Sequence, residues 1–282
     1  MVAITAMSIS RFAPSPTGYL HLGHAFSALF AARHADSHAG GRFLLRLEDI
    51  DRTRCRPEFA TAILEDLAWL GLRWDGAVRV QSEHFSDYAR VLDELRTRRL
   101  IYPCFCTRAE IALSVSAPHG PDGTAIYPGT CRRLDPVLAA ERCAAGMAHA
   151  WRLDMEQALN STGAGLNYEE LGQGTIRCDP ARFGDVVLAR KDAPASYHLC
   201  VTHDDALQNV DLVTRGLDLQ HTTDVHRVLQ TLMGWPTPRY AHHRLILGAD
   251  GKRLAKRDRA QTLRELKIHG VTAAEVLAML EF

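Results

Sequence analysis

Residues 11–24 read RFAPSPTGYLHLGH. Before this stretch, Met7 to Phe12 is predicted to be a short strand, and after it the Ala-rich apolar run from Leu20 to Ala39 is predicted to be a helix. The prolines and glycines between them mark a strand-to-helix turn. The exposed N–H groups and the positive dipole end of a helix attract anions. The stretch therefore indicates an α/β fold with a phosphate site at this turn.

Two histidines strengthen this interpretation. His21 and His24 are three residues apart, so they lie on one face of the first helical turn, where both imidazoles could hydrogen-bond a nucleotide phosphate. The alternative is an ordinary loop and helix with two histidines, because the spacing of Gly18 and Gly23 matches neither a P-loop nor a GxGxxG motif.

The composition is that of an ordinary globular protein. The chain has 282 residues, 46% of them hydrophobic and 23% charged, with a formal net charge of zero. That balance argues against non-specific coating of nucleic acid but permits local basic patches. The sequence shows neither a membrane span nor a signal-peptide pattern, so a cytoplasmic protein is expected. Seven cysteines in such a protein suggest thiols or metal ligands rather than disulfides.

The next segments extend the α/β pattern. Residues 42–47 read as a strand, and the ranges 57–70 and 86–100 have apolar residues at helical spacing. This order predicts a doubly wound parallel sheet. The strand at residues 42–47 is followed by the acidic run 48–52. This run could hold an ammonium group at the ligand-binding edge of the sheet, or it could cap the next helix.

Three cysteines bracket a Gly/Pro-rich loop. Cys104, Cys106 and Cys131 offer three thiolates, and zinc prefers four ligands in a tetrahedron. His119, in the intervening loop, is the standard chemical choice for the fourth ligand. Three buried thiols without a metal are the alternative.

The opening stretch resembles the "HIGH" segment of class I aminoacyl-tRNA synthetases, in the version found in the glutamyl-tRNA synthetase family. LLRLEDID, at residues 44–51, is similar to the second recurrent segment of that family, which implies that Glu48 contacts the amino group of glutamate. Tyr197 in SYH and Arg215 in VTRGLDL resemble positions that bind the amino acid. A guanidinium suits a carboxylate because it can bind two oxygens at once.

The basic segment RLAKR, at residues 253–257, is similar to the "KMSKS" loop, with Arg253 and Ala255 as departures and Lys256 in the position that contacts the leaving phosphates. The implied ATP-binding residues are His21, His24, Arg253 and Lys256, of which the two histidines and Lys256 are the implied catalytic residues. The implied glutamate-binding residues are Arg11, Phe12, Ala13, Pro14, Ser15, Glu48, Tyr197 and Arg215.

The resemblance also implies an architecture. A Rossmann-type catalytic domain is expected in two halves, residues 1–103 and 185–282, around a zinc-containing insertion at 104–184. The spacing C-x-C…Y-x-x-x-C is similar to the glutamyl-queuosine branch of the family, which implies Tyr127 as the fourth ligand in preference to His119. Only 26 residues (282 − 256) follow Lys256, so no anticodon-binding domain is expected.

The implied reaction is activation of L-glutamate by ATP with Mg²⁺, followed by transfer to the queuosine base of tRNA(Asp), with structural Zn²⁺ and no membrane partner. A monomer is expected. One alternative is a truncated or discriminating glutamyl-tRNA synthetase that charges the 3′ end of tRNA. Another is a catalytically idle module on the same fold that binds RNA or a metabolite.

Overall fold

A parallel sheet begins at the strand before the opening turn. The computed structural model describes residues 8–36, 40–113, 120–121, 123, 125–163, 165–246 and 261–282. In it, β1 (Ile9–Phe12) pairs in parallel with β2 (Arg42–Leu47), and β2 pairs in parallel with β3 (Arg79–Val80). Nearly every residue of β1 and β2 is buried, as expected for strands covered on both faces.

A second sheet adjoins β1. Its central strand β10 (Arg239–His243) runs parallel to β9 (Leu212–Gly216) and to β6 (Asn167–Glu170), and β7 (Gly174–Arg177) pairs antiparallel with β6. The main-chain N–H of Asp211 donates to Ile9 O at 3.1 Å, while Ile9 N–H donates to Asp211 Oδ1 at 2.9 Å. These bonds bring the start of β9 beside β1, so the opening turn lies next to the segment that contains Arg215.

A third, antiparallel sheet carries the cysteine-rich loop. Its strands are β4 (Ile101–Cys104), β5 (Ala150–Leu153) and β8 (Val187–Ala189), with β5 in the middle. Cys104 closes β4, so the strand fixes the first of the three clustered thiols.

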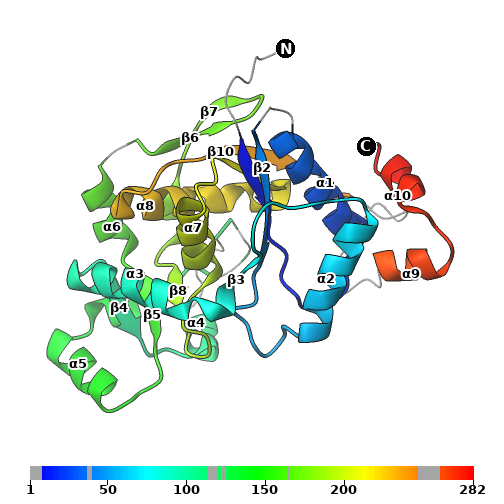
Figure 1. Cartoon of the computed structure of the whole chain (residues 1–282). Coiled ribbons are helices and arrows are strands. Elements are labelled where there is room, and N and C mark those ends of the chain that lie inside the picture. Colours follow the sequence, from blue (N-terminus) through cyan, green and yellow to red (C-terminus); the bar gives the residue numbers. More distant parts are fainter. Residues whose placement is uncertain are drawn as a thin grey trace.

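Helices cover the sheets on two sides (Figure 1). On one side, α1, α2, α9 and α10 pack with β1 and β2 around a core that includes Phe12, Leu45 and Ile63. On the other, α3, α6, α7 and α8 surround a second core with the antiparallel sheet. The helices are α1 (Leu22–Asp36), α2 (Pro57–Trp69), α3 (Phe85–Thr97), α4 (Arg108–Leu113), α5 (Pro136–Ala144), α6 (Met155–Thr162), α7 (Tyr197–Leu207), α8 (Thr223–Met233), α9 (Leu263–Ile268) and α10 (Ala273–Met279). Short 3₁₀ turns lie at η1 (Gln81–Glu83), η2 (Thr130–Arg133), η3 (Pro180–Phe183) and η4 (Leu217–Thr222).

The α/β fold with a parallel sheet is confirmed, with differences at its edges. The first strand begins at Ile9 instead of Met7, and the first helix begins at Leu22 instead of Leu20. Strand β6 lies within the polar, glycine-rich stretch from Asn160 to Gly174, whose composition is typical of a loop. Its buried positions are Tyr168 and Glu170, and a buried glutamate conceals the apolar alternation by which a strand is recognised. Among the helices of the described residues, none has the length and apolar character needed to cross a bilayer.

A fully buried arginine joins β2 to α7. Arg46 Nη1 lies 2.9 Å from Asp205 Oδ1 and also donates to Gln208 Oε1 at 3.0 Å. Its Nη2 lies 3.6 Å from Glu48 Oε1, and its Nε lies 4.0 Å from Asp204 Oδ2. A buried cation is tolerated only when carboxylates compensate it, so this cluster ties the two elements together.

Arg46→Met tests this connection. Removing one partner of a buried ion pair leaves the other uncompensated, so the free energy of unfolding is expected to fall by about 3–5 kcal/mol. Urea unfolding followed by circular dichroism measures it. Arg42→Met, at the exposed start of the same strand, is the matched control and is expected to change stability by less than about 0.5 kcal/mol. Equal losses in the two variants would contradict the assignment.

Candidate functional site

The opening turn lines a cavity of about 480 Å³. The other walls come from the end of β2, the start of α7, the end of β9 and the residues after β10. The residues predicted from sequence that line this one cavity are Arg11, Phe12, Ala13, Pro14, Ser15, His21, His24, Glu48, Tyr197 and Arg215. The structure thus brings together side chains that are up to 204 residues apart (215 − 11) in the sequence, although their ligand-binding roles stay predictions.

Two backbone hydrogen bonds hold the turn in place. Glu48 N–H donates to Pro14 O at 3.0 Å, and Arg56 N–H donates to Pro16 O at 3.0 Å. Because prolines lack an N–H, the turn can use only its carbonyls at these positions, and the segment after β2 supplies the donors.

The two histidines stack at the start of α1. Their ring centroids are 3.8 Å apart. His21 Nδ1 accepts the N–H of Gly23 at 3.1 Å, and His24 Nδ1 accepts the N–H of His21 at 3.2 Å. Each neutral ring therefore carries its proton on Nε2. A Cβ at Gly23 would lie only 3.0 Å from His21 Cε1, so glycine lets the imidazole cap the helix this closely.

The charge of Arg11, which lines the cavity, is compensated by a buried carboxylate. Arg11 Nε and Nη2 donate to the two carboxylate oxygens of Asp205 at 2.8 and 3.3 Å, and Arg11 Nη1 donates to Thr214 O at 3.0 Å. Although burial opposes it, Arg11 and Arg46 hold the pKa of Asp205 below its usual range. Asp205 is therefore ionised and fixes the Arg11 side chain at the cavity wall.

The carboxyl group of Glu48 differs from that of Asp205 in the direction of its pKa shift. Burial raises the pKa of its carboxyl to about 7, even though Arg46 and Arg11 act in the opposite direction. Asp205 and Asp204 add to the rise. The carboxylate is therefore only partly formed near neutral pH, and a cationic ligand would complete its ionisation.

The basic segment with Arg253 and Lys256 lies outside the described residues. The residues before and after this segment lie at or next to the cavity. Ile246 lines the cavity, and Thr262 forms an isolated β-bridge with His21. Leu263 N–H donates to Leu20 O at 2.8 Å, so the start of α9 is anchored beside the histidines.

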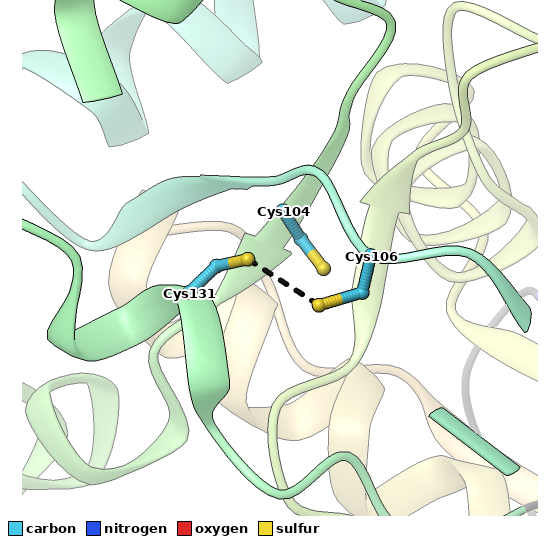
Figure 2. A group of neighbouring side chains, drawn as sticks. All are labelled: Cys104, Cys106 and Cys131. Carbon is cyan, nitrogen blue, oxygen red and sulfur yellow. Dashed lines mark hydrogen bonds between the residues drawn. The ribbon is translucent and has the colours of Figure 1, made fainter. Parts of the chain in front are cut away.

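The three cysteines converge at the end of β4, where Cys104 is the last residue of the strand. The sulfur atoms of Cys104, Cys106 and Cys131 lie within 4.8 Å of one another (Figure 2). Cys106 Sγ is 3.5 Å from Cys131 Sγ and 3.4 Å from the hydroxyl of Tyr127. Tetrahedral zinc with Zn–S bonds of about 2.3 Å requires sulfurs roughly 3.8 Å apart. The donor set and its spacing therefore fit zinc.

Tyr127 is held in position as the candidate fourth ligand. Its hydroxyl accepts the N–H of Cys131 at 2.8 Å, and the guanidinium carbon of Arg152 lies 4.0 Å from the centroid of its ring. Burial raises the pKa of Cys106 to about 11, so without a cation this thiol stays protonated. His119 lies outside the described residues.

Sequence reasoning missed several residues around the cavity. Asp205 pairs with Arg46 and with Arg11, a residue of the cavity wall, and His226 and His242 contact Arg215. One signal was present: Arg46 interrupts the apolar strand predicted at residues 42–47, strands of a parallel sheet are usually buried, and a buried arginine requires a partner. No local signal identified Asp205, His226 or His242.

With this geometry in view, comparisons with known proteins give the family. Residues 9–281 match the model of the class I tRNA synthetases (E and Q), catalytic domain. A glutamyl-Q tRNA(Asp) synthetase from Rhodobacter capsulatus is 46% identical over 95% of this chain and 98% of the relative. The chain belongs to the class I tRNA synthetases (E and Q). The Nocardia farcinica protein of the same name is 44% identical over 99% of this chain and 85% of that protein.

Comparison with solved structures supports this family assignment. The glutamate–tRNA ligase from Elizabethkingia meningosepticum, crystallised in complex with its amino acid, matches with a TM-score of 0.74 and 28% identity over 90% of this chain. The present chain spans about half the length of that ligase, 52% of it. An arginyl-tRNA synthetase from Campylobacter jejuni, at 10% identity and a TM-score of 0.53, shares the fold alone.

The cysteine cluster gives a testable prediction about metal content. Protein purified without added zinc is expected to contain one zinc ion per chain by elemental analysis. Tyr127→Phe keeps the ring but removes the oxygen. Since losing an outer-sphere partner already weakens metal binding by about 10- to 100-fold, chelator competition should show at least that loss.

Cys143→Ser is the matched control, because Cys143 is a free thiol outside the cluster. It should retain zinc like the parent chain. Substoichiometric zinc together with unchanged stability in chelator would contradict the metal site.

Proposed function

We propose that this chain activates L-glutamate with ATP and transfers it to the queuosine base in the anticodon of tRNA(Asp). The observation that supports this most is the single cavity that joins Glu48, Tyr197 and Arg215 to the His21–His24 end of α1, in a chain that is 46% identical to a glutamyl-Q tRNA(Asp) synthetase. In the activation step, a carboxylate oxygen of glutamate attacks the α-phosphate of ATP, and pyrophosphate leaves.

The proposed glutamate half of the cavity has groups of both signs. Glu48 would receive the ammonium group, while Arg215 and Arg11 would receive carboxylate oxygens through N–H donors in a fork geometry. The carboxylate-binding role is stronger for Arg215, because Asp205 already takes two donors of Arg11. Glutamine would leave a buried guanidinium charge unpaired, which favours glutamate.

The proposed ATP half is the helix terminus. The tautomers of His21 and His24 carry their protons on Nε2, so both rings present donors to phosphate oxygens as charge grows there in the transition state. Lys256 and Arg253 would contribute from the segment anchored at Ile246 and Thr262, with Mg²⁺ accompanying ATP. The proposed site is complete within one chain, which is compatible with the monomer we propose, and we infer a cytoplasmic location from the proposed substrates.

The acceptor is the part of the proposal that most needs testing. Glutamate–tRNA ligases from Acidithiobacillus ferrooxidans and Aquifex aeolicus are also similar, at 40% and 37% identity. The higher identity to the glutamyl-Q proteins favours the queuosine base over the 3′ end. The ion pairs and stacked histidines around the cavity favour an enzyme over an idle binding module.

Labelling distinguishes these outcomes. The protein is incubated with ATP, labelled glutamate and total tRNA from cells with and without queuosine. We expect label only on queuosine-containing tRNA, mapped to the anticodon loop. Label on the 3′ terminus, or label that is independent of queuosine, would replace the proposed acceptor. Absence of glutamate-dependent pyrophosphate exchange would favour the binding module.

The pKa of Glu48 predicts a pH dependence for glutamate binding. An ammonium group binds the carboxylate and not the carboxylic acid, and the pKa of Glu48 in the free protein is raised to about 7. Affinity should therefore be full above pH 7 and should fall as pH decreases, approaching about tenfold per pH unit well below the pKa. Calorimetric titration with glutamate from pH 5.5 to 8 measures this.

Glu48→Gln is the control for the pH experiment. It cannot ionise, so it should bind glutamate weakly and with little pH dependence over the same range. A parent chain whose affinity is flat between pH 5.5 and 8, or a variant that keeps the parent's slope, would contradict the role of Glu48.

A further inference from the structure

Arg215 differs in its partners from Arg11 and Arg46, the two other buried arginines near the cavity. Its Nε donates to His242 Nε2 at 3.0 Å, its Nη1 lies 3.2 Å from His226 Nδ1, and its Nη2 donates to the hydroxyl of Thr223. Within the described part of the chain, no carboxylate forms an ion pair with this guanidinium. Arg11 and Arg46, by contrast, both pair with Asp205.

The direction of these hydrogen bonds fixes both imidazole tautomers. Since His242 Nε2 accepts from Arg215, its proton is on Nδ1, which donates to Glu170 Oε2 at 2.7 Å. Glu170 Oε1 accepts the main-chain N–H of His242, also at 2.7 Å. His226 accepts through Nδ1, so its proton is on Nε2 and lies toward His198 Nδ1 at 3.3 Å.

Both rings are uncharged in this arrangement. Burial lowers the pKa of His226 well below its usual range, and Arg215 and His198 lower it further. Burial also lowers the pKa of His242, and Arg215 adds to this effect while the Glu170 carboxylate opposes it. The histidines therefore orient the guanidinium without neutralising it. A carboxylate in their place would satisfy the same donors but would compete with any anionic ligand.

We propose that His226 and His242 are positioning residues that hold Arg215 as an uncompensated cation facing the cavity, and that they thereby set the preference for a carboxylate over an amide on the substrate side chain. This inference rests on the proposed glutamate-activating function. Glu170 acts one step further away: its carboxylate is separated from Arg215 by the His242 ring, so it fixes the tautomer while the guanidinium keeps its charge.

The two histidines accept through different nitrogens, which gives a test with matched variants. The amide oxygen of glutamine reaches about as far as Nε2, and that of asparagine about as far as Nδ1. His242→Gln and His226→Asn should therefore keep an acceptor for Arg215. The swapped variants, His242→Asn and His226→Gln, have the same chemistry but misplace the acceptor.

The readout is glutamate-dependent ATP–pyrophosphate exchange. The swapped variants should raise KM for glutamate by about 10- to 100-fold, the cost of a lost hydrogen bond to a charged group, while KM for ATP stays within about twofold. Their preference for glutamate over glutamine should fall by a similar factor. The acceptor-keeping variants should remain close to the parent chain, as should His269→Gln at the exposed end of α9.

Thermal unfolding of each variant separates positioning from folding. If swapped and acceptor-keeping variants have the same KM for glutamate, or if KM for both substrates and kcat change together, the inference is overturned while the proposed function stands. If the parent chain shows no exchange with glutamate, the proposed function fails, and this inference fails with it.

Discussion

The site depends on one buried carboxylate between two arginines. Asp205, on α7, binds Arg11 from β1 and Arg46 from β2. In a medium of low polarity, each of these groups would be strongly destabilising without the others. The cluster therefore fixes how α7 is placed against the parallel strands. Because α7 begins at Tyr197 and β2 ends before Glu48, the same constraint also places the proposed glutamate-binding residues.

The three buried arginines near the cavity differ in how their charge is compensated. Asp205 pairs with both Arg11 and Arg46, and of these two arginines Arg11 lines the cavity wall. Arg215 is surrounded by neutral imidazoles and a hydroxyl, so its charge remains for a ligand. Burial alone would not make this distinction, since all three side chains are almost inaccessible to solvent. The chemical type of the partner decides which guanidinium can bind a carboxylate.

Local sequence signals predicted part of this structure. The turn at residues 13–18 was identifiable because proline and glycine restrict the backbone wherever they occur. The strand at residues 42–47 had an apolar run of the right length. The order of the predicted strands and helices then predicted the α/β fold. Glu48, Tyr197 and Arg215 were identified through resemblance, and their roles remain predictions. Strand β6 was missed because buried Glu170 stands where an apolar residue was expected, and its partner His242 is 72 residues away. Asp205 was missed because its partner Arg11 is 194 residues away.

That separation of 194 residues has a consequence for how the protein is made. At a synthesis rate of about 5–20 residues per second, Arg11 is synthesised roughly 10 to 40 seconds before Asp205. During this interval β1 and β2 lack the carboxylate that compensates both of their buried arginines, so they cannot bury those side chains in the final arrangement. The nascent N-terminal half must therefore stay incompletely packed until α7 emerges, and such exposed, unfinished strands are the surfaces that molecular chaperones bind.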